Sequence, residues 1–208
     1  MIPTLLAAAI GFALGSIPFS WITARLFGGV DIRTTGSGNV GATNVARTAG
    51  WRAGALALLL DAAKGATAVL LARVACPGAP AGDLVAGGMA VIGHLYSPFL
   101  RFRGGKGVAT GAGVFLVLAP PALGIAAIGF AITVALTRYV SLASIVAALM
   151  VPAASFLLGM RGGTVLLASL VAILVVARHR GNLERLVAGK ERRIGGGRAG
   201  RTSAGASR

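Results

Sequence analysis

A polar stretch, Ser37-Gly-Asn-Val-Gly-Ala-Thr-Asn-Val-Ala-Arg47, interrupts an otherwise apolar sequence. Its glycines allow neighbouring backbone N–H groups to converge on one point, and its hydroxyl groups add further hydrogen-bond donors. Arg47 supplies a planar fork of N–H groups that matches two oxygens of a phosphate. The composition is typical of an anion-binding loop. A connector between two membrane spans that binds nothing could have the same composition, and the stretch alone leaves this alternative open.

Two further polar clusters lie far along the sequence from this stretch. One is Gly93-His-Leu-Tyr-Ser-Pro-Phe-Leu-Arg-Phe-Arg-Gly-Gly-Lys-Gly107, and the other is His179-Arg-Gly-Asn-Leu-Glu-Arg185. Each of the three clusters combines basic, amide and glycine residues. If they meet on one face of a membrane, they would form a shared pocket for a ligand that carries phosphate.

The familiar nucleotide, acyltransferase and metal motifs do not fit. The segment 36–41 matches G-x-G-x-x-G, but no predicted strand precedes it. Lys106 is followed by Gly107 instead of the Ser or Thr of a P-loop. The H-x-x-x-x-D pattern fails at His94, because Phe99 occupies the acidic position. With only two histidines, five scattered carboxylates and one cysteine in the chain, we expect no metal and no cofactor.

The composition indicates a membrane protein with several spans in one domain. Of the 208 residues, 56% are hydrophobic and only 12% are charged, and the mean hydropathy is +0.84. Soluble domains carry about twice that charged fraction. The net charge of +15 would suggest nucleic-acid binding in a soluble protein, but here membrane topology accounts for it, so no nucleic-acid partner is expected.

The apolar runs predict seven helical spans, because a lipid environment requires every backbone polar group to be paired within the segment. The predicted spans are 4–26, 53–75, 84–100, 108–119, 120–137, 142–158 and 164–178. The fourth run would rise only about 18 Å, short of a hydrocarbon core about 30 Å thick. Pro120 and Pro121 follow it, so 108–137 is either one kinked span or a short helix that does not cross the bilayer, followed by a full span.

The distribution of basic residues predicts the orientation. With seven spans, all 20 Lys and Arg residues except Lys64, Arg73 and Arg161 lie on one side. The positive-inside rule makes that side cytoplasmic, with the N-terminus outside and the C-terminus in the cytoplasm. Six spans would place the basic tail opposite the basic segment 27–52. We expect one membrane-embedded domain over residues 1–194 and a disordered basic tail over residues 195–208, because this glycine-rich tail cannot bury a core.

The three clusters together resemble a known family. Ser-Gly-Asn-x-Gly-Ala-Thr-Asn-x-x-Arg from residue 37, Gly-His…Phe-x-Gly-Gly-Lys-Gly ending at residue 107, and His-x-x-Asn-Leu-x-Arg-Leu from residue 179 occur in this order. They closely resemble the bacterial acyl-phosphate:glycerol-3-phosphate acyltransferases (the PlsY family), over about residues 11–194. The resemblance implies a seven-helix inner-membrane enzyme whose active site faces the cytoplasm. It would transfer a fatty acyl group from acyl phosphate to the 1-hydroxyl of glycerol 3-phosphate, giving lysophosphatidic acid and phosphate.

The resemblance also implies roles for individual residues. The catalytic residues, which would hold the phosphate of glycerol 3-phosphate, are Ser37, Arg47, Lys106, His179 and Asn182. The residues that would shape a phosphate-binding loop, for the acyl phosphate, are Gly38, Asn39, Gly41, Thr43 and Asn44. The glycines that would let the loop of Lys106 approach a phosphate are Gly104, Gly105 and Gly107. Which loop binds which phosphate is left open.

Some assignments keep an alternative. His94 would either accept a proton or donate to phosphate, or it would satisfy a backbone carbonyl at a helix end. Lys106 could be an interfacial lysine with its ammonium in water. Asp61 and Lys64, one helical turn apart within the second span, are interpreted as a structural pair facing the bundle interior, with catalysis as the alternative.

A rival function comes from another class of protein. Basic clusters and a short fourth helix would also suit a transporter or channel for phosphate or another small anion. However, nearly all the polar clusters lie on one predicted face, with little polar lining towards the other side. We therefore expect the acyltransferase, with membrane lipids around it. The sequence gives no oligomeric state.

Overall fold

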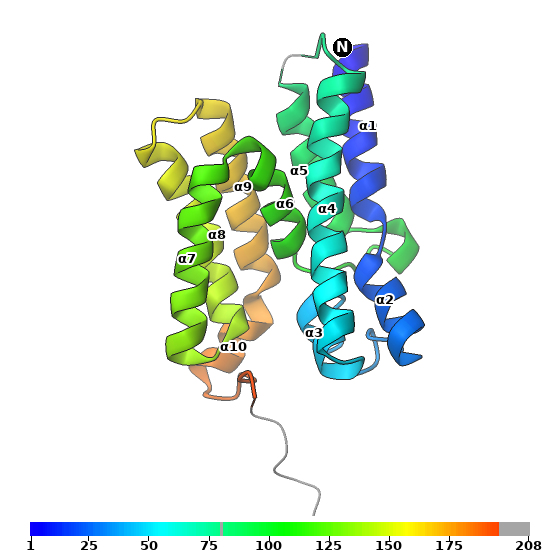
Figure 1. Ribbon diagram of the computed structural model, residues 1–208, viewed down its shortest axis with the longest axis vertical. Helices are drawn as coiled ribbons and strands as arrows, with labels where there is room; N and C mark the ends of the chain where they lie inside the picture. The colour runs from blue at the N-terminus through cyan, green and yellow to red at the C-terminus, as the bar shows by residue number, and fades with distance from the viewer. Residues whose placement is uncertain (80, 196–208) are drawn as a thin grey trace, which may run out of the picture.

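The computed structural model describes residues 1–79 and 81–195, and over these ranges it contains helices and no strands (Figure 1). The all-α prediction is confirmed for this part of the chain. The predicted disordered tail lies outside the described residues, except for Gly195. The helices are α1 (Ile2–Ser16), α2 (Phe19–Gly28), α3 (Ala42–Thr48), α4 (Trp51–Ala75), α5 (Gly82–Leu95), the 3-10 helix η1 (Pro98–Leu100), α6 (Val108–Leu118), α7 (Pro120–Thr137), α8 (Val140–Leu157), α9 (Gly162–Arg178) and α10 (Arg180–Val187).

Four segments are long and apolar enough to cross a membrane, namely Ile2–Gly28, Trp51–Ala75, Pro120–Thr137 and Val140–Leu157. A fifth is the pair α9 and α10, which is bent by 57°. The helices α5, with 14 residues, and α6, with 11, are shorter than a typical span. The predicted runs are mainly helical, but length and composition identify four or five spans in the described residues.

Two of the predicted spans are interrupted. The first is broken between α1 and α2, where Pro18 cannot continue the backbone hydrogen bonding of α1. The third ends at Leu95, and η1 follows it, with Pro98 at its first position. The run 108–137 is two helices, because Ala119 has a non-helical backbone conformation and Pro120 begins α7. The breaks after α1 and α5 place irregular backbone next to the polar clusters, whereas the break between α6 and α7 lies at the opposite end of the bundle.

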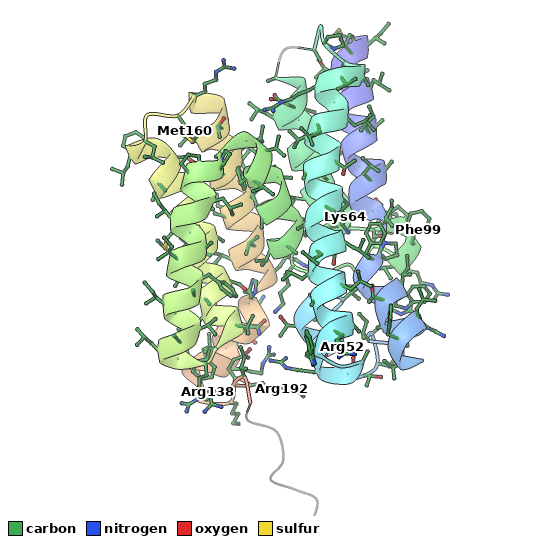
Figure 2. The ribbon with its side chains drawn as sticks, in the orientation of Figure 1. Arg52, Lys64, Phe99, Arg138, Met160 and Arg192 are labelled. Carbon is green, nitrogen blue, oxygen red and sulfur yellow. The ribbon has the colours of Figure 1, made fainter. Side chains whose placement is uncertain are left out.

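The helices form two groups with α6 between them (Figure 1). In one group α1 packs against α4 and α5, while α2 and α3 pack at the lower end of α4. In the other group α7, α8 and α9 pack in sequence, and α10 turns beneath α9. Arg52, Arg138 and Arg192 lie at the lower end, Met160 lies at the opposite end, and Lys64 lies about halfway (Figure 2).

Glycines allow the helix backbones of the first group to touch. A Cβ atom on Gly15 of α1 would overlap the backbone of Ala90 in α5, and one on Gly65 of α4 would overlap the carbonyl of Thr110 in α6. Such close approach is the usual packing mode of membrane helices, because lipid provides little hydrophobic drive for helix association. The position of α5 and α6, and so of the loop between them, depends on these contacts.

The packing predicts opposite effects of the same substitution at two helical glycines. Gly15→Ala should lower the melting temperature of the detergent-solubilised protein, since overpacking costs about 1–3 kcal/mol. Gly124→Ala, in α7, should leave it unchanged or raise it slightly, because no atom of the described residues lies within 4 Å of the added Cβ. Equal melting temperatures for the two variants would contradict the close α1–α5 contact.

Candidate functional site

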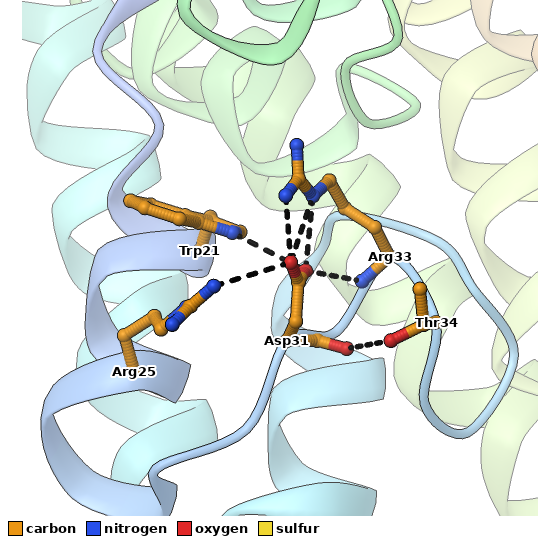
Figure 3. Close-up of polar contacts among 5 residues, drawn as sticks. All are labelled: Trp21, Arg25, Asp31, Arg33 and Thr34. Atoms are coloured by element: carbon orange, nitrogen blue, oxygen red, sulfur yellow. Dashed lines mark hydrogen bonds and ion pairs between the residues drawn. The ribbon is translucent and has the colours of Figure 1, made fainter.

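Asp31 fixes the chain just before the first polar cluster (Figure 3). Its carboxylate accepts hydrogen bonds from Arg33, at 2.6 Å for Nη2, from Arg25 Nη2 at 3.4 Å and from Trp21 Nε1 at 3.3 Å. The hydrogen bond from Arg33 holds the pKa of the Asp31 carboxyl well below its usual range. The connection from α2 to the polar loop is thus tied to α2 at neutral pH.

Asn44 shapes the polar loop from its centre. Its side chain is 1% exposed. Its Oδ1 accepts from the Ser37 N–H at 2.9 Å, and its Nδ2 donates to the carbonyls of Ile32 and Thr35, both at 3.0 Å. Gly36 lies against Asn44 with a φ of +69°, a conformation that favours glycine. Asn44 was predicted to bind substrate. Its amide group instead forms its hydrogen bonds with the loop, whose shape it fixes.

Other polar groups of this cluster are free to meet a ligand. Within the described ranges, the side chains of Ser37, Thr43 and Arg47 form no hydrogen bond, and Ser37 and Arg47 are exposed. Gly38 has a φ of +72°, and Gly41 precedes α3 in an extended conformation. A Cβ on Gly41 would crowd the Asn39 amide. The loop is thus ordered by Asn44, while its hydroxyl groups and guanidinium remain available.

The second cluster packs directly against the first. A Cβ on Gly105 would overlap the carbonyl oxygen of Val40 and the ring of His94, and one on Gly104 would overlap the His94 carbonyl. Arg178, at the end of α9, donates from Nη2 to the Gly104 carbonyl at 2.9 Å and from Nε to the Gly105 carbonyl at 3.2 Å. Glycines are therefore required for this loop to fit between α5 and the segment 37–41.

Lys106 joins the second cluster to the third. Its ammonium donates to Oδ1 of Asn182 in α10. The Asn182 amide in turn donates to Oε1 of Glu191 at 2.6 Å, and Glu191 also accepts from Ser141 Oγ at 2.9 Å and from Arg185 Nε at 2.8 Å. These hydrogen bonds lower the pKa of Glu191. Segments from three parts of the chain are thus linked through one lysine and one carboxylate.

Arg47 and Lys106 lie close enough for their positive charges to interact. Burial lowers the pKa of Lys106 to about 8, and the charge of Glu191 only partly offsets this. The positive charges of Arg185, Arg178 and Arg47 lower it further. Partial burial also lowers the pKa of Arg47, as does the charge of Arg192. Such an excess of positive charge favours an anionic ligand.

His179 lies at the bend between α9 and α10 and is 2% exposed. Its Nδ1 is 2.7 Å from the Val175 carbonyl oxygen. Since a carbonyl can only accept, Nδ1 carries the hydrogen, and in the neutral ring Nε2 is the acceptor. The positive charge of Lys106 lies close enough to His179 to disfavour protonation of its ring. His179 can therefore accept a hydrogen bond from a hydroxyl group in this site.

His94 lies behind the glycine loop with a buried ion pair. The Lys64 ammonium is 2.8 Å from Asp61 Oδ1, and both side chains are 2% exposed. His94 Nδ1 is 3.6 Å from the same oxygen, and Ser20 Oγ donates to Asp61 Oδ2 at 2.6 Å. Lys64 also donates to the Ile17 carbonyl, at the break of the first span, at 2.7 Å. The pair faces the bundle interior, as predicted.

The cavity beside this pair has a volume of only about 10 Å³. A volume of this size holds at most one water molecule. The buried pair is thus no ligand pocket. It stabilises the break in the first span and positions His94, whose ring supports the Gly104–Gly105 segment.

Removing one charge of this pair should destabilise the protein strongly. Asp61→Asn leaves the Lys64 ammonium buried without its counter-ion, which costs about 3–5 kcal/mol, and the melting temperature in detergent should fall accordingly. Arg73→Gln, which breaks the more exposed pair with Asp83 at 3.2 Å, should cost at most about 1 kcal/mol. If Asp61→Asn does not fold, the neutral double variant Asp61→Asn, Lys64→Met should recover folded protein. A melting temperature for Asp61→Asn equal to that of the wild type would contradict the pairing.

Sequence reasoning missed three residues that hold the site together. Asp31 and Glu191 were not in the predicted set, although each is one of only five acidic residues in the chain, and that scarcity was the available signal. Arg178 is one of the many basic residues on the predicted cytoplasmic side, and the structure shows that it binds two carbonyls of the glycine loop. In the described part of the chain, these three residues hold in place the segments that carry the predicted site residues.

The fold and the site define a class of protein: an all-helical membrane protein with a basic, polar site at one end of the bundle. The sequence profile of a family described as glycerol-3-phosphate acyltransferase matches residues 5–189. A glycerol-3-phosphate acyltransferase of Jannaschia sp. (strain CCS1) is 51% identical over 191 residues, covering 91% of this chain and 92% of the relative. One of Anaeromyxobacter dehalogenans (strain 2CP-C) is 45% identical over 201 residues, covering 93% and 100%.

Two solved structures are also similar. A crystal structure of PlsY (YgiH), described as an integral membrane glycerol 3-phosphate acyltransferase in its glycerol 3-phosphate form, has a TM-score of 0.87 at 38% identity and covers 92% of this chain and 96% of that one. A lysophosphatidic acid form has a TM-score of 0.83 at 35% identity, with coverage of 91% and 94%. The chain belongs to the glycerol-3-phosphate acyltransferase family. It is a multi-pass membrane protein and an acyltransferase, as the resemblance predicted.

Proposed function

We propose that this protein transfers a fatty acyl group from acyl phosphate to the 1-hydroxyl of glycerol 3-phosphate, giving lysophosphatidic acid and phosphate. The observation that carries the proposal is the grouping of Arg47 and Lys106 with the Asn182 amide in one site with excess positive charge. Both proposed substrates carry phosphate, and both products keep one. Membership of the family favours this enzyme over an anion transporter.

The phosphate of glycerol 3-phosphate binds to the ammonium of Lys106 and the guanidinium fork of Arg47, with the Ser37 hydroxyl as a further donor. Asn182 orients Lys106 through its Oδ1. His179 Nε2 accepts a hydrogen bond from the glycerol moiety, since Nδ1 is occupied by Val175. This arrangement holds the 1-hydroxyl at a fixed distance from the phosphate.

The acyl phosphate binds at the loop that Asn44 organises. Glycine-rich backbone with free hydroxyl groups suits the phosphate of this second substrate. His94 contributes through Gly105, whose backbone it supports. The residues that form or support this subsite are Gly38, Asn39, Gly41, Thr43, Asn44, His94, Gly104, Gly105 and Gly107, of which Asn44 and His94 act by holding the backbone in place.

The reaction needs no covalent intermediate, because an acyl phosphate is a mixed anhydride and already activated. The 1-hydroxyl oxygen attacks the acyl carbon, the bond from that carbon to the phosphate oxygen breaks, and the hydroxyl proton passes to a phosphate oxygen. The enzyme contributes alignment of the two substrates and stabilisation of the negative charge on the carbonyl oxygen and the leaving phosphate.

The proposal includes an arrangement in the membrane. Seven spans, with α6 not crossing the full bilayer, place the N-terminus outside and the C-terminus in the cytoplasm of a bacterial inner membrane. The domain extends over residues 1–194, and the active site faces the cytoplasm, where the basic residues of the lower end lie. Membrane lipids surround the bundle, and the acyl chain enters from the bilayer.

Phosphate release from purified protein tests the function. In detergent, the protein should release phosphate only when acyl phosphate and glycerol 3-phosphate are both present, and lysophosphatidic acid should accumulate in equal amount. Release from acyl phosphate alone would indicate hydrolysis. No release, together with phosphate uptake into liposomes that contain the protein, would favour the transporter.

Arg47→Lys keeps the charge but loses the two parallel N–H groups of the fork. We expect kcat/KM for glycerol 3-phosphate to fall about 100-fold, the effect of losing about 3 kcal/mol of charge-assisted hydrogen bonding. Arg52→Lys, also at the lower end (Figure 2), serves as the control and should remain close to wild type. Near-normal kinetics of Arg47→Lys would exclude Arg47 from the phosphate site.

The pKa of Lys106, at about 8, predicts a pH dependence. Below this value the ammonium is charged and binds phosphate; above it the neutral amine does not. Thus kcat/KM, which reports the free enzyme, should fall as the pH rises through about 8. The bound phosphate dianion favours the ammonium, so kcat should fall only at higher pH. A flat kcat/KM profile between pH 7 and about 10 would contradict a role for this ammonium.

A further inference from the structure

A second hollow lies at the end of the bundle opposite the proposed active site. The helix α4, with 25 residues, rises about 37 Å, but α6, with 11, rises only about 16 Å. Beyond the end of α6 the two helix groups enclose a groove of about 760 Å³. It lies between the ends of α4 and α6, the start of α5 and the turn from α8 to α9, near Met160 in Figure 2.

The groove has a basic rim and apolar walls. Arg73 and Arg161 are the two arginines that line it, and Asp83, its one acidic residue, pairs with Arg73 at 3.2 Å. In the described ranges Arg161 is exposed and has no ion-pair partner. The walls are formed by Leu84, Leu118, Leu158 and Met160. The groove therefore combines one free positive charge with an apolar interior.

Thr164 adds an unused donor inside the groove. Its side chain lines the groove, is 7% exposed and forms no hydrogen bond among the described residues. It belongs to the first turn of α9, where no side chain caps the helix. The N–H groups of Gly162 and Gly163 have no backbone acceptor within those ranges. Free N–H groups at a helix start favour a negative charge.

We propose that this groove binds the head group of one anionic phospholipid from the leaflet opposite the active site. Its phosphate lies between Arg161, the Thr164 hydroxyl and the start of α9, and its acyl chains follow the apolar walls. Charge complementarity supports a phosphate-bearing ligand, and the volume and the apolar walls favour a lipid over a free ion. The proposal does not depend on the acyl-transfer mechanism.

Native mass spectrometry of the full-length protein in mild detergent tests this site. Titration with phosphatidylglycerol should show one retained lipid, bound about tenfold more weakly by Arg161→Gln, as expected for losing one charge-assisted contact. Thr164→Val should weaken it less. Arg52→Gln, the same charge change at the opposite end, should retain it. Arg161→Gln should keep wild-type acyl transfer, which shows that it is folded.

The alternatives give different results. Equal binding of phosphatidylcholine and phosphatidylglycerol would overturn a site for anionic lipid. If Arg161→Gln and Arg52→Gln weakened lipid binding equally, the effect would come from the general surface charge, and the proposed site would also be overturned. Displacement of the lipid by inorganic phosphate would assign the groove to a free anion instead. Failure of acyl transfer in the wild-type protein would contradict the proposed function and leave the lipid titration unaffected.

Discussion

The hydrogen bond from Lys106 to Asn182 is the interaction on which the site depends. It connects the loop between α5 and α6 to the helix α10, which lies 76 residues further along the chain. Glu191 orients the same amide and supplies a nearby negative charge. Without this link, the excess positive charge around Lys106 would drive the two segments apart. The ammonium of Lys106 is thus charged near neutral pH. It can also donate hydrogen bonds to a phosphate in addition to Asn182.

Breaks in the apolar helices make such a site possible inside a membrane protein. Irregular backbone at membrane depth is tolerated only where protein groups pair with it. Here Lys64 caps the Ile17 carbonyl, Ser97 Oγ donates to the Ser16 carbonyl at 2.6 Å, and Arg178 binds the carbonyls of the glycine loop. The buried pair of Asp61 and Lys64 therefore stabilises the backbone break on which the polar loops rest.

The sequence predicted the helical class, the family and the three clusters, because apolar runs and motifs are local signals. It predicted the separation of α6 from α7 as one of two alternatives, since Pro120 marked it. It did not predict the break at Pro18 or the end of α5 at Leu95, because the apolar residues continue through both points and hydropathy is insensitive to backbone geometry. The roles of Asp31, Arg178 and Glu191 depend on contacts between segments distant in sequence, which no local pattern contains.

A double-mutant cycle on Lys106 and Asn182 tests the central claim most directly. The quantity measured is kcat/KM for glycerol 3-phosphate in Lys106→Met, Asn182→Ala and the double variant. If Asn182 acts by orienting Lys106, the double variant should lose less than the sum of the single losses, with a coupling of at least about 1 kcal/mol. Additive losses would show that the two side chains act independently and would contradict the account.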